Sequence, residues 1–162
     1  MGAKCVRSLS HQVLPRSVII KKINGKQTKQ VYDLGKRAFP KETWLTREFV
    51  SETIHGSGVN LGAYENNKMV GTILVKNEDP PKSWIYYFVV DRVYRRQGIG
   101  TLLLKKAEKI LGKKNWLMFV DLGDQDELAK RFYKRNKFSK VARIKNWFGR
   151  GIAGLIYSKE LQ

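Results

Sequence analysis

Cysteine and histidine are scarce in this chain of 162 residues, which contains only Cys5, His11 and His55. A single thiol excludes an internal disulfide and a zinc site built on several thiolates. The two histidines have no close spacing, so a histidine-based metal site is not expected either. No apolar run approaches the roughly 20 residues that span a membrane. The sequence therefore predicts a cytoplasmic protein with no metal centre and no membrane contact.

Acidic residues are also few, with 14 Asp and Glu against 32 Lys and Arg, which gives a net charge of +18 and a pI near 10.1. Such a field attracts polyanions, including nucleic acid, acidic proteins and phosphorylated ligands, and disfavours polycationic substrates. A lysine-rich surface that is simply solvated has the same composition. Composition alone leaves both interpretations open.

The length fits one domain, and 42% hydrophobic and 11% aromatic residues indicate a folded core. The first acidic residue is Asp33, so no carboxylate balances the charge of the basic residues that precede it. We expect residues 1–17 to form a flexible basic extension and residues 18–162 to form the domain.

Short apolar runs alternate with amphipathic stripes along the domain, in the order β-α-α-β-β-β-α-β-α-β-β. The strand, helix and strand over residues 84–122 require a right-handed parallel crossover, whereas the neighbouring ββ units imply antiparallel pairs. The pattern predicts an α/β (α+β) fold with a mixed, mostly antiparallel sheet of six or seven strands and four helices on both faces. Thr43 or Thr46 is expected to cap the second helix, and Asp124 with Glu127 to cap the fourth.

The segment Tyr94–Thr101 lies between a buried strand and the strongest helical stripe, which includes Leu102 and Ile110. Gly98 and Gly100 let the backbone approach a ligand, and the free N–H groups of the helix start favour an anion. No Lys-Ser/Thr pair follows Gly100, and Leu103 stands where a dinucleotide fingerprint has its third glycine, so two common phosphate loops are disfavoured. A glycine turn kept for packing is the alternative.

The loop Arg95–Gly100, together with Ala129–Tyr133 and Phe138, resembles the coenzyme A loop and the later signature of the GNAT acetyltransferase superfamily. The resemblance extends from about Ser17 to Leu161. The sequence departs from the family pattern at three positions, where a Pro, an Asn and a Gly are usual: Arg92, Asp126 and Lys137.

The resemblance implies a single GNAT-like domain whose sheet is splayed at the middle, with acetyl-CoA as co-substrate. Phe88 and Val90 would pair their backbone with the pantetheine arm, and the Val90 N–H would be the oxyanion donor. The resemblance also implies a set of cofactor-binding residues, which are Phe88, Val89, Val90, Arg95, Arg96, Gln97, Gly98, Ile99, Gly100, Thr101, Asp126 and Tyr133.

Two residues match catalytic positions of the family. Tyr133 would be the general acid that protonates the departing thiolate, although it also continues the apolar stripe of Leu128, Ala129 and Phe132 and could be a core aromatic. Asp121 aligns with the base of the ribosomal-protein-alanine enzymes, and its alternative role is a strand-end carboxylate that caps the next helix.

Within the superfamily the chain is most similar to the N-terminal α-amino acetyltransferases, including the ribosomal-protein-alanine group. The likeness rests on two loops that would bind the acceptor, with Phe39, Trp44, Asn146 and Trp147. It implies direct attack of a protein or peptide N-terminus on the thioester in a ternary complex, by a monomer or homodimer.

Two other functions stay open. A closed pocket would favour a small-molecule amine as acceptor, whereas an open groove lined by Trp44 and Trp147 favours a peptide. A basic nucleic-acid-binding module is suggested by the net charge, and the basic surface would also let an acetyltransferase contact ribosomal RNA. The basic residues of one helix carry this hypothesis: Lys130, Arg131, Lys134, Arg135 and Lys137.

Overall fold

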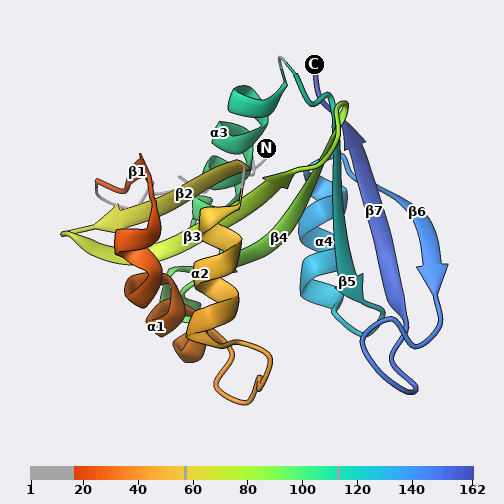
Figure 1. Ribbon diagram of the computed structural model, residues 1–162, viewed down its shortest axis with the longest axis horizontal. Coiled ribbons are helices and arrows are strands. Elements are labelled where there is room, and N and C mark those ends of the chain that lie inside the picture. Colours follow the sequence, from red (N-terminus) through yellow and green to blue (C-terminus); the bar gives the residue numbers. More distant parts are fainter. Residues whose placement is uncertain (1–16, 57, 113) are drawn as a thin grey trace, which may run out of the picture.

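The computed structural model describes residues 17–56, 58–112 and 114–162, so the predicted basic extension lies outside the described residues except for Ser17. Figure 1 shows strands and helices alternating along these residues. The strands are β1 (Ile19–Lys22), β2 (Gly58–Glu65), β3 (Lys68–Asn77), β4 (Lys82–Val90), β5 (Leu117–Gly123), β6 (Ser139–Ile144) and β7 (Gly154–Glu160). The helices are α1 (Thr28–Ala38), α2 (Arg47–His55), α3 (Ile99–Leu111) and α4 (Glu127–Arg135), with short 3-10 turns η1 (Gly25–Gln27) and η2 (Arg92–Tyr94).

The seven strands form one sheet in the order β1-β2-β3-β4-β5-β7-β6. Every neighbouring pair is antiparallel except β4 and β5, which α3 connects as a parallel crossover. The predicted mixed, mostly antiparallel sheet is therefore confirmed, and so is the element order. The β2–β3 hairpin turns at Asn66 and Asn67, which both have positive φ as tight hairpin turns require.

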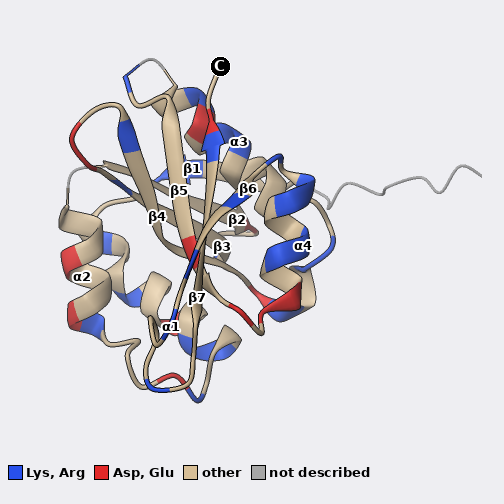
Figure 2. Ribbon diagram, turned by 90° about the vertical axis from the view of Figure 1, so that its right-hand side faces the viewer, with Lys and Arg blue, Asp and Glu red and all other residues tan. Residues whose placement is uncertain are grey.

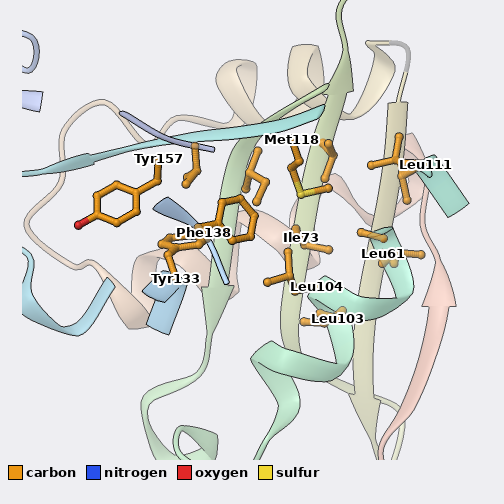
Figure 3. Close-up of a cluster of buried hydrophobic side chains, with 14 of the residues drawn as sticks. Leu61, Ile73, Leu103, Leu104, Leu111, Met118, Tyr133, Phe138 and Tyr157 are labelled. Atoms are coloured by element: carbon orange, nitrogen blue, oxygen red, sulfur yellow. The ribbon is translucent and has the colours of Figure 1, made fainter. Parts of the chain in front are cut away.

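The helices cover both faces of the sheet, as predicted. α1 and α2 pack over one face around Leu34, Val50 and Leu74. α3 and α4 cover the other face, where the larger apolar cluster includes Leu103, Leu104, Met118, Tyr133 and Phe138 (Figure 3). The site described below lies in the sheet between these two pairs of helices.

Two local predictions are corrected by the structure, and a third is decided. Leu102, Ile110 and Leu128 belong to predicted apolar stripes but are exposed, because at about 100° per residue they fall beside the arc that the sheet covers. Asp124 does not cap α4, since its carboxylate pairs with Arg143 at 3.0 Å. Asp126 is the N-cap of that helix. Of the two candidate caps for α2, Thr46 accepts the Phe49 N–H and is confirmed.

The parallel strands β4 and β5 are paired with each other at one end only. Its register runs from Lys82↔Leu117 to Ile85↔Val120 and stops there, although β4 continues to Val90 and β5 to Gly123. The β3–β4 register also shifts between Leu74 and Val75, which leaves Tyr86 as the extra residue of a β-bulge. Figure 1 shows the two strands diverging beyond their paired ends. The sheet is therefore splayed at its middle, as the family resemblance implied.

Candidate active site

The start of α3 presents backbone N–H groups that no side chain caps. Gly98 is the N-cap residue and has φ +82°, a conformation that favours glycine. The first helical bond is donated by the Leu102 N–H to the Gly98 carbonyl at 3.0 Å, so the amides of residues 99–101 precede the helical hydrogen bonding. A Cβ built at Gly98 would meet nothing within 4 Å. The amides therefore face open space, where an anion can approach them.

Gly100 has a packing role, which was the alternative for this loop. A Cβ at this position would lie 3.2 Å from the Phe132 ring and 3.7 Å from the Phe88 ring. Glycine therefore lets Phe132 of α4 and Phe88 of β4, which meet edge to face at 5.4 Å, approach the first turn of α3. The two glycines serve different purposes: Gly98 shapes the backbone, and Gly100 leaves room for aromatic rings.

The loop before α3 is held by hydrogen bonds to its own backbone. Arg95 Nε donates to the Val90 carbonyl at 3.0 Å, and the Gln97 amide donates to the Val93 carbonyl at 3.1 Å. Arg96 has φ +63° and is exposed. The loop therefore keeps positive charge beside the open amides of α3.

An ion pair between a buried carboxylate and a partly exposed arginine ties this loop to α1. Asp91 is only 7% exposed, accepts the Val93 N–H, and pairs with Arg37 Nε at 3.1 Å. The sequence interpretation missed this contact because the partners stand 54 residues apart. Asp91 thus fixes the turn that leads from β4 into the loop.

Beyond Ile85, where the pairing of β4 with β5 ends, β4 has unpaired backbone N–H groups. These point toward the gap between the two diverging strands. The Asp91 N–H donates to the Val70 carbonyl at 2.9 Å, and antiparallel pairs alternate between bonded and unbonded residues. Val89 is therefore bonded toward β3, whereas the backbone N–H groups of Phe88 and Val90 point toward the splayed side. A ligand chain lying in the gap could bond to them as an added strand.

Tyr133 lies on the α3–α4 side of the gap. Its side chain is 5% exposed and packs edge to face against Phe132 and Phe138, at 5.2 Å each. Figure 3 shows Tyr133 beside Phe138. Burial, with a further contribution from the charges of Asp121 and Asp126, raises the pKa of its phenol well above the ordinary 10.0. Tyr133 is therefore a core aromatic that also keeps a proton on its hydroxyl at neutral pH.

Asp121 lies on the opposite face of β5. Its neighbours Met118, Val120 and Leu122 face the α3–α4 core, so alternation turns Asp121 to the side of α1 and α2. One carboxylate oxygen accepts the Trp84 indole N–H at 3.0 Å, and the other accepts the Trp147 indole N–H at 2.7 Å. Asp121 caps no helix, so its alternative role is wrong. Trp84 was not among the predicted site residues.

Trp147 reaches Asp121 from the β6–β7 loop, residues 145–153. A Cβ at Gly154 would lie 2.4 Å from the indole, so the ring rests directly on the backbone of β7. Asn146 shapes the same loop, since its φ is +58° and its side-chain oxygen accepts the Gly151 N–H at 2.8 Å. Of the four predicted acceptor residues, the structure brings Trp147 into contact with a predicted catalytic residue.

The α1–α2 loop, residues 39–46, carries the other two. Phe39 packs against the α1–α2 core. Trp44 is 49% exposed, donates to Glu42 at 2.8 Å, and meets the rings of Phe49 and Tyr87 edge to face. The contacts found for these two residues join them to the α1–α2 core and to Tyr87 of β4, and not to Asp121.

The arrangement therefore combines an anion site, a gap with free backbone groups, a protonated phenol on one side and a carboxylate on the other. Within residues 17–56, 58–112 and 114–162, no three His, Cys, Asp or Glu side chains gather closely enough to hold a metal ion. In the same ranges, no helix has the length and apolar character needed to cross a membrane.

Residues 28–138 match the sequence model of the Acetyltransferase (GNAT) family. Solved structures share the fold. Ard1 from Thermoplasma volcanium superposes with a TM-score of 0.82 at 18% identity, covering 90% of this chain and 98% of its own. The ribosomal-protein-alanine N-acetyltransferase from Escherichia coli gives 0.79 at 16% identity, covering 90% and 95%.

An aminoglycoside 6′-N-acetyltransferase solved with coenzyme A also gives a TM-score of 0.79, at 18% identity and with 89% and 97% of the two chains covered. No curated protein sequence matches the chain at a significant level. The structural matches thus share the fold at low identity, and their names include acceptors of different kinds.

The residues present fit coenzyme A. Its diphosphate requires free N–H donors and nearby cations, and the first turn of α3 with Arg95 and Arg96 supplies both. A Cβ at position 98 would meet nothing within 4 Å, so there is open space beside the first turn of α3. The splay between β4 and β5 leaves unpaired backbone groups for an extended arm.

Proposed function

The chain is an acetyl-CoA-dependent N-acetyltransferase of the GNAT family, and we propose that its acceptor is the N-terminal α-amino group of a protein or peptide. One observation carries this choice of acceptor. The two tryptophans of the acceptor loops do not close over the site, because Trp44 is 49% exposed and Trp147 is 45% exposed. An open site with aromatic walls admits the first residues of a chain, whereas a small amine is usually bound in an enclosed pocket.

The carrier would be held at three places. The amides of residues 97–101 bind the diphosphate together with Arg95 and Arg96, and the backbone of residues 88–90 pairs with the extended arm. Tyr133 would stand near the thiol end, as the resemblance implies, whereas the Asp126 carboxylate, which the resemblance also assigns to the carrier, is bonded to the Ala129 N–H of its own helix. Val89 lies between Phe88 and Val90, but its own backbone is bonded to β3, so it makes no backbone bond to the arm.

Acetyl-CoA supplies an activated acetyl group on a thiol that must leave. Tyr133 Oη holds a proton at neutral pH, since its ordinary pKa of 10.0 lies well above 7 and burial raises it further, and it donates that proton to the departing sulfur. The Val90 N–H points into the gap, where it can donate to the carbonyl oxygen as negative charge develops. Tyr133 therefore acts as general acid and Val90 as the oxyanion donor.

Asp121 acts on the acceptor. Its carboxylate attracts the acceptor ammonium and removes the proton, directly or through water, so that a neutral amine can attack. Each of its oxygens accepts one indole N–H, which fixes the carboxylate and leaves further lone pairs for the amine. Trp84 and Trp147 are positioning residues that hold this group at the open side of the gap.

A small-molecule amine is the second candidate acceptor. The structural likeness to an aminoglycoside 6′-N-acetyltransferase is as close as that to the ribosomal-protein-alanine enzyme. Asp121 would attract any ammonium group, so the geometry of the acceptor loops decides between these candidates.

A coenzyme A release assay separates the two. The acceptors are peptides varied at their first two residues, the same peptides with blocked N-termini, peptides with lysine side chains only, spermidine and an aminoglycoside. We expect turnover with free N-termini and none with the blocked peptides. Faster turnover of the small amines than of every peptide would contradict the proposal.

A further inference from the structure

One segment of the chain contains basic residues and no acidic ones. Between Glu127 and Glu160 there is no Asp or Glu in the sequence. This segment forms the body of α4, all of β6, the β6–β7 loop and most of β7. It carries ten basic residues, which are Lys130, Arg131, Lys134, Arg135, Lys137, Lys140, Arg143, Lys145, Arg150 and Lys159.

The basic residues of α4 lie on one side of the helix. At about 100° per residue, Lys130, Arg131, Lys134 and Arg135 fall within an arc of about 140°. The opposite side carries Ala129, Phe132 and Tyr133, which pack against the core. Figure 2 shows the body of α4 in blue, whereas α2 across the molecule carries acidic bands. We call Arg131, Lys134, Arg135, Lys137 and Lys140 the basic face.

The charges of the basic face are not neutralised locally. Where the structure describes the chain, none of its five side chains forms an ion pair with a carboxylate. Glu127, at the first turn of α4, pairs with Lys130, and this contact together with the charges of Arg131 and Lys134 lowers its pKa. The surroundings of α4 therefore carry a positive potential that attracts a polyanion.

The chemistry of the face selects among polyanions. Binding of single strands relies on exposed aromatic rings that stack on bases. Phe132 and Tyr133 of α4 face inward, and the exposed rings of the segment, Trp147 and Phe148, lie in the β6–β7 loop and not on α4. Insertion into a membrane surface needs an apolar helix side, and α4 has already buried its own. Contact with the phosphates of a duplex needs only cations spaced along a helix, and a duplex has the higher charge density.

We propose that the basic face binds the sugar–phosphate backbone of a double-helical nucleic acid without reading its sequence. This surface is separate from the acceptor side, because α4 covers the face of the sheet opposite Asp121. The binding does not depend on which amine the enzyme acetylates. An acidic protein would need complementary carboxylates, and it is the competing outcome of the test.

The test is fluorescence anisotropy of a labelled 20-base-pair RNA duplex and a DNA duplex with the full chain, between 50 and 200 mM salt. One variant carries Arg131→Gln, Lys134→Gln, Arg135→Gln and Lys137→Gln. The matched control carries Lys22→Gln, Lys26→Gln, Lys68→Gln and Lys82→Gln, which removes the same charge from other exposed positions. Thermal unfolding confirms that both variants fold.

We expect the wild type to bind both duplexes and to lose about a hundredfold in affinity over this salt range. The face variant should bind at least about 30-fold more weakly at 50 mM salt, with a salt slope smaller by about 3. The control should change affinity less than threefold, and acetylation of the best peptide should be unchanged in both.

Four results would overturn the proposal: no duplex binding at 50 mM salt, equal losses in the two variants, displacement of the duplex by saturating coenzyme A, or tighter binding of polyglutamate than of either duplex. Displacement would assign the face to the phosphates of the carrier, and tighter polyglutamate binding would assign it to an acidic protein.

Discussion

α3 and α4 cover the same face of the sheet but begin in opposite ways. α4 starts at Asp126, whose carboxylate accepts the Ala129 N–H at 2.9 Å, and Glu127 follows in the first turn. α3 starts at Gly98, with no side-chain cap and no acidic residue in its first turn. Arg95 and Arg96 precede it.

This difference shows how one fold assigns separate tasks to similar helices. The dipole and free amides at the start of α4 are satisfied by its own carboxylates. The same groups at the start of α3 have no side-chain cap, so we propose that the anion site belongs to α3. In this proposal α4 contributes to the site through a side chain, Tyr133, and not through its backbone.

The largest effect is expected when that side-chain contribution is removed. Tyr133→Phe keeps the ring in the core but deletes the proton donor, so kcat should fall about a thousandfold. The Kd of coenzyme A should change less than threefold, since the amides of α3 are untouched. Steady-state kinetics and calorimetry measure the two quantities. Unchanged kcat would leave Tyr133 as a core aromatic only.

The second prediction gives α3 the kind of start that α4 has. Gly98→Asp places a carboxylate at the N-cap, where it competes with the diphosphate and repels it. The Kd of coenzyme A should rise about a hundredfold, measured by calorimetry.

Gly98→Asn is the matched control for this change. Asn has the same shape and tolerates the left-handed backbone equally well, so it isolates the charge. Its Kd should rise less than tenfold. Equal losses in the Asp and Asn variants would show that shape, and not charge, excludes the carrier.

The third prediction tests the contact between the two helices. Gly100→Ala places a Cβ 3.2 Å from the Phe132 ring, so this ring of α4 must move by a few tenths of an ångström. We expect coenzyme A affinity to fall about tenfold, because a small displacement at a binding loop weakens several bonds together. Gly56→Ala is the control, because its closest contact is the flexible end of Lys76 at 3.1 Å, and the nearest backbone atom, the Thr53 carbonyl oxygen, is at an ordinary 3.4 Å. An affinity equal to that of the control would contradict a tight contact.

The fourth prediction concerns stability at alkaline pH. The pKa of Tyr133 is raised in the folded state, so the folded chain holds this proton more tightly than the unfolded chain. Its contribution is complete below about pH 10 and is lost as the pH rises toward the folded pKa. Between pH 9 and 11 the wild type should lose about 1.4 kcal/mol more than Tyr133→Phe in urea unfolding. Parallel curves would contradict the shift.

The smallest effect is expected when the N-cap of α4 is removed. Asp126→Ala deletes the bond to the Ala129 N–H and should lower stability by about 1 kcal/mol. Coenzyme A affinity should change less than threefold, because the carboxylate is engaged by its own helix. A tenfold loss of affinity in this variant would show that Asp126 also reaches the carrier, as the family resemblance implies.

Local patterns explain what the sequence predicted correctly. The glycine spacing at Gly98 and Gly100 and the helical stripe of α3 lie within one segment, so the uncapped helix start could be predicted without knowing the fold, and the anion site proposed there stays a prediction. The parallel crossover followed from the strand, helix and strand order alone. The splay of the sheet came from the family resemblance and was confirmed.

Contacts between distant segments could not be predicted in this way. The bonds from Trp84 and Trp147 to Asp121 join residues 37 and 26 positions apart, and they depend on the register of β5 with its neighbours. Asp124 and Asp126 both suit a cap, and the turn that follows β5 decides between them, since the Asp126 N–H donates to the Gly123 carbonyl. Sequence spacing contains neither kind of information.

The most direct test of the account is an amide NMR spectrum of the labelled chain titrated with coenzyme A. The account predicts the largest shifts at the backbone N–H groups of residues 97–101 and little change at residues 127–130. Shifts that are absent from the start of α3, or that concentrate at the start of α4, would contradict it.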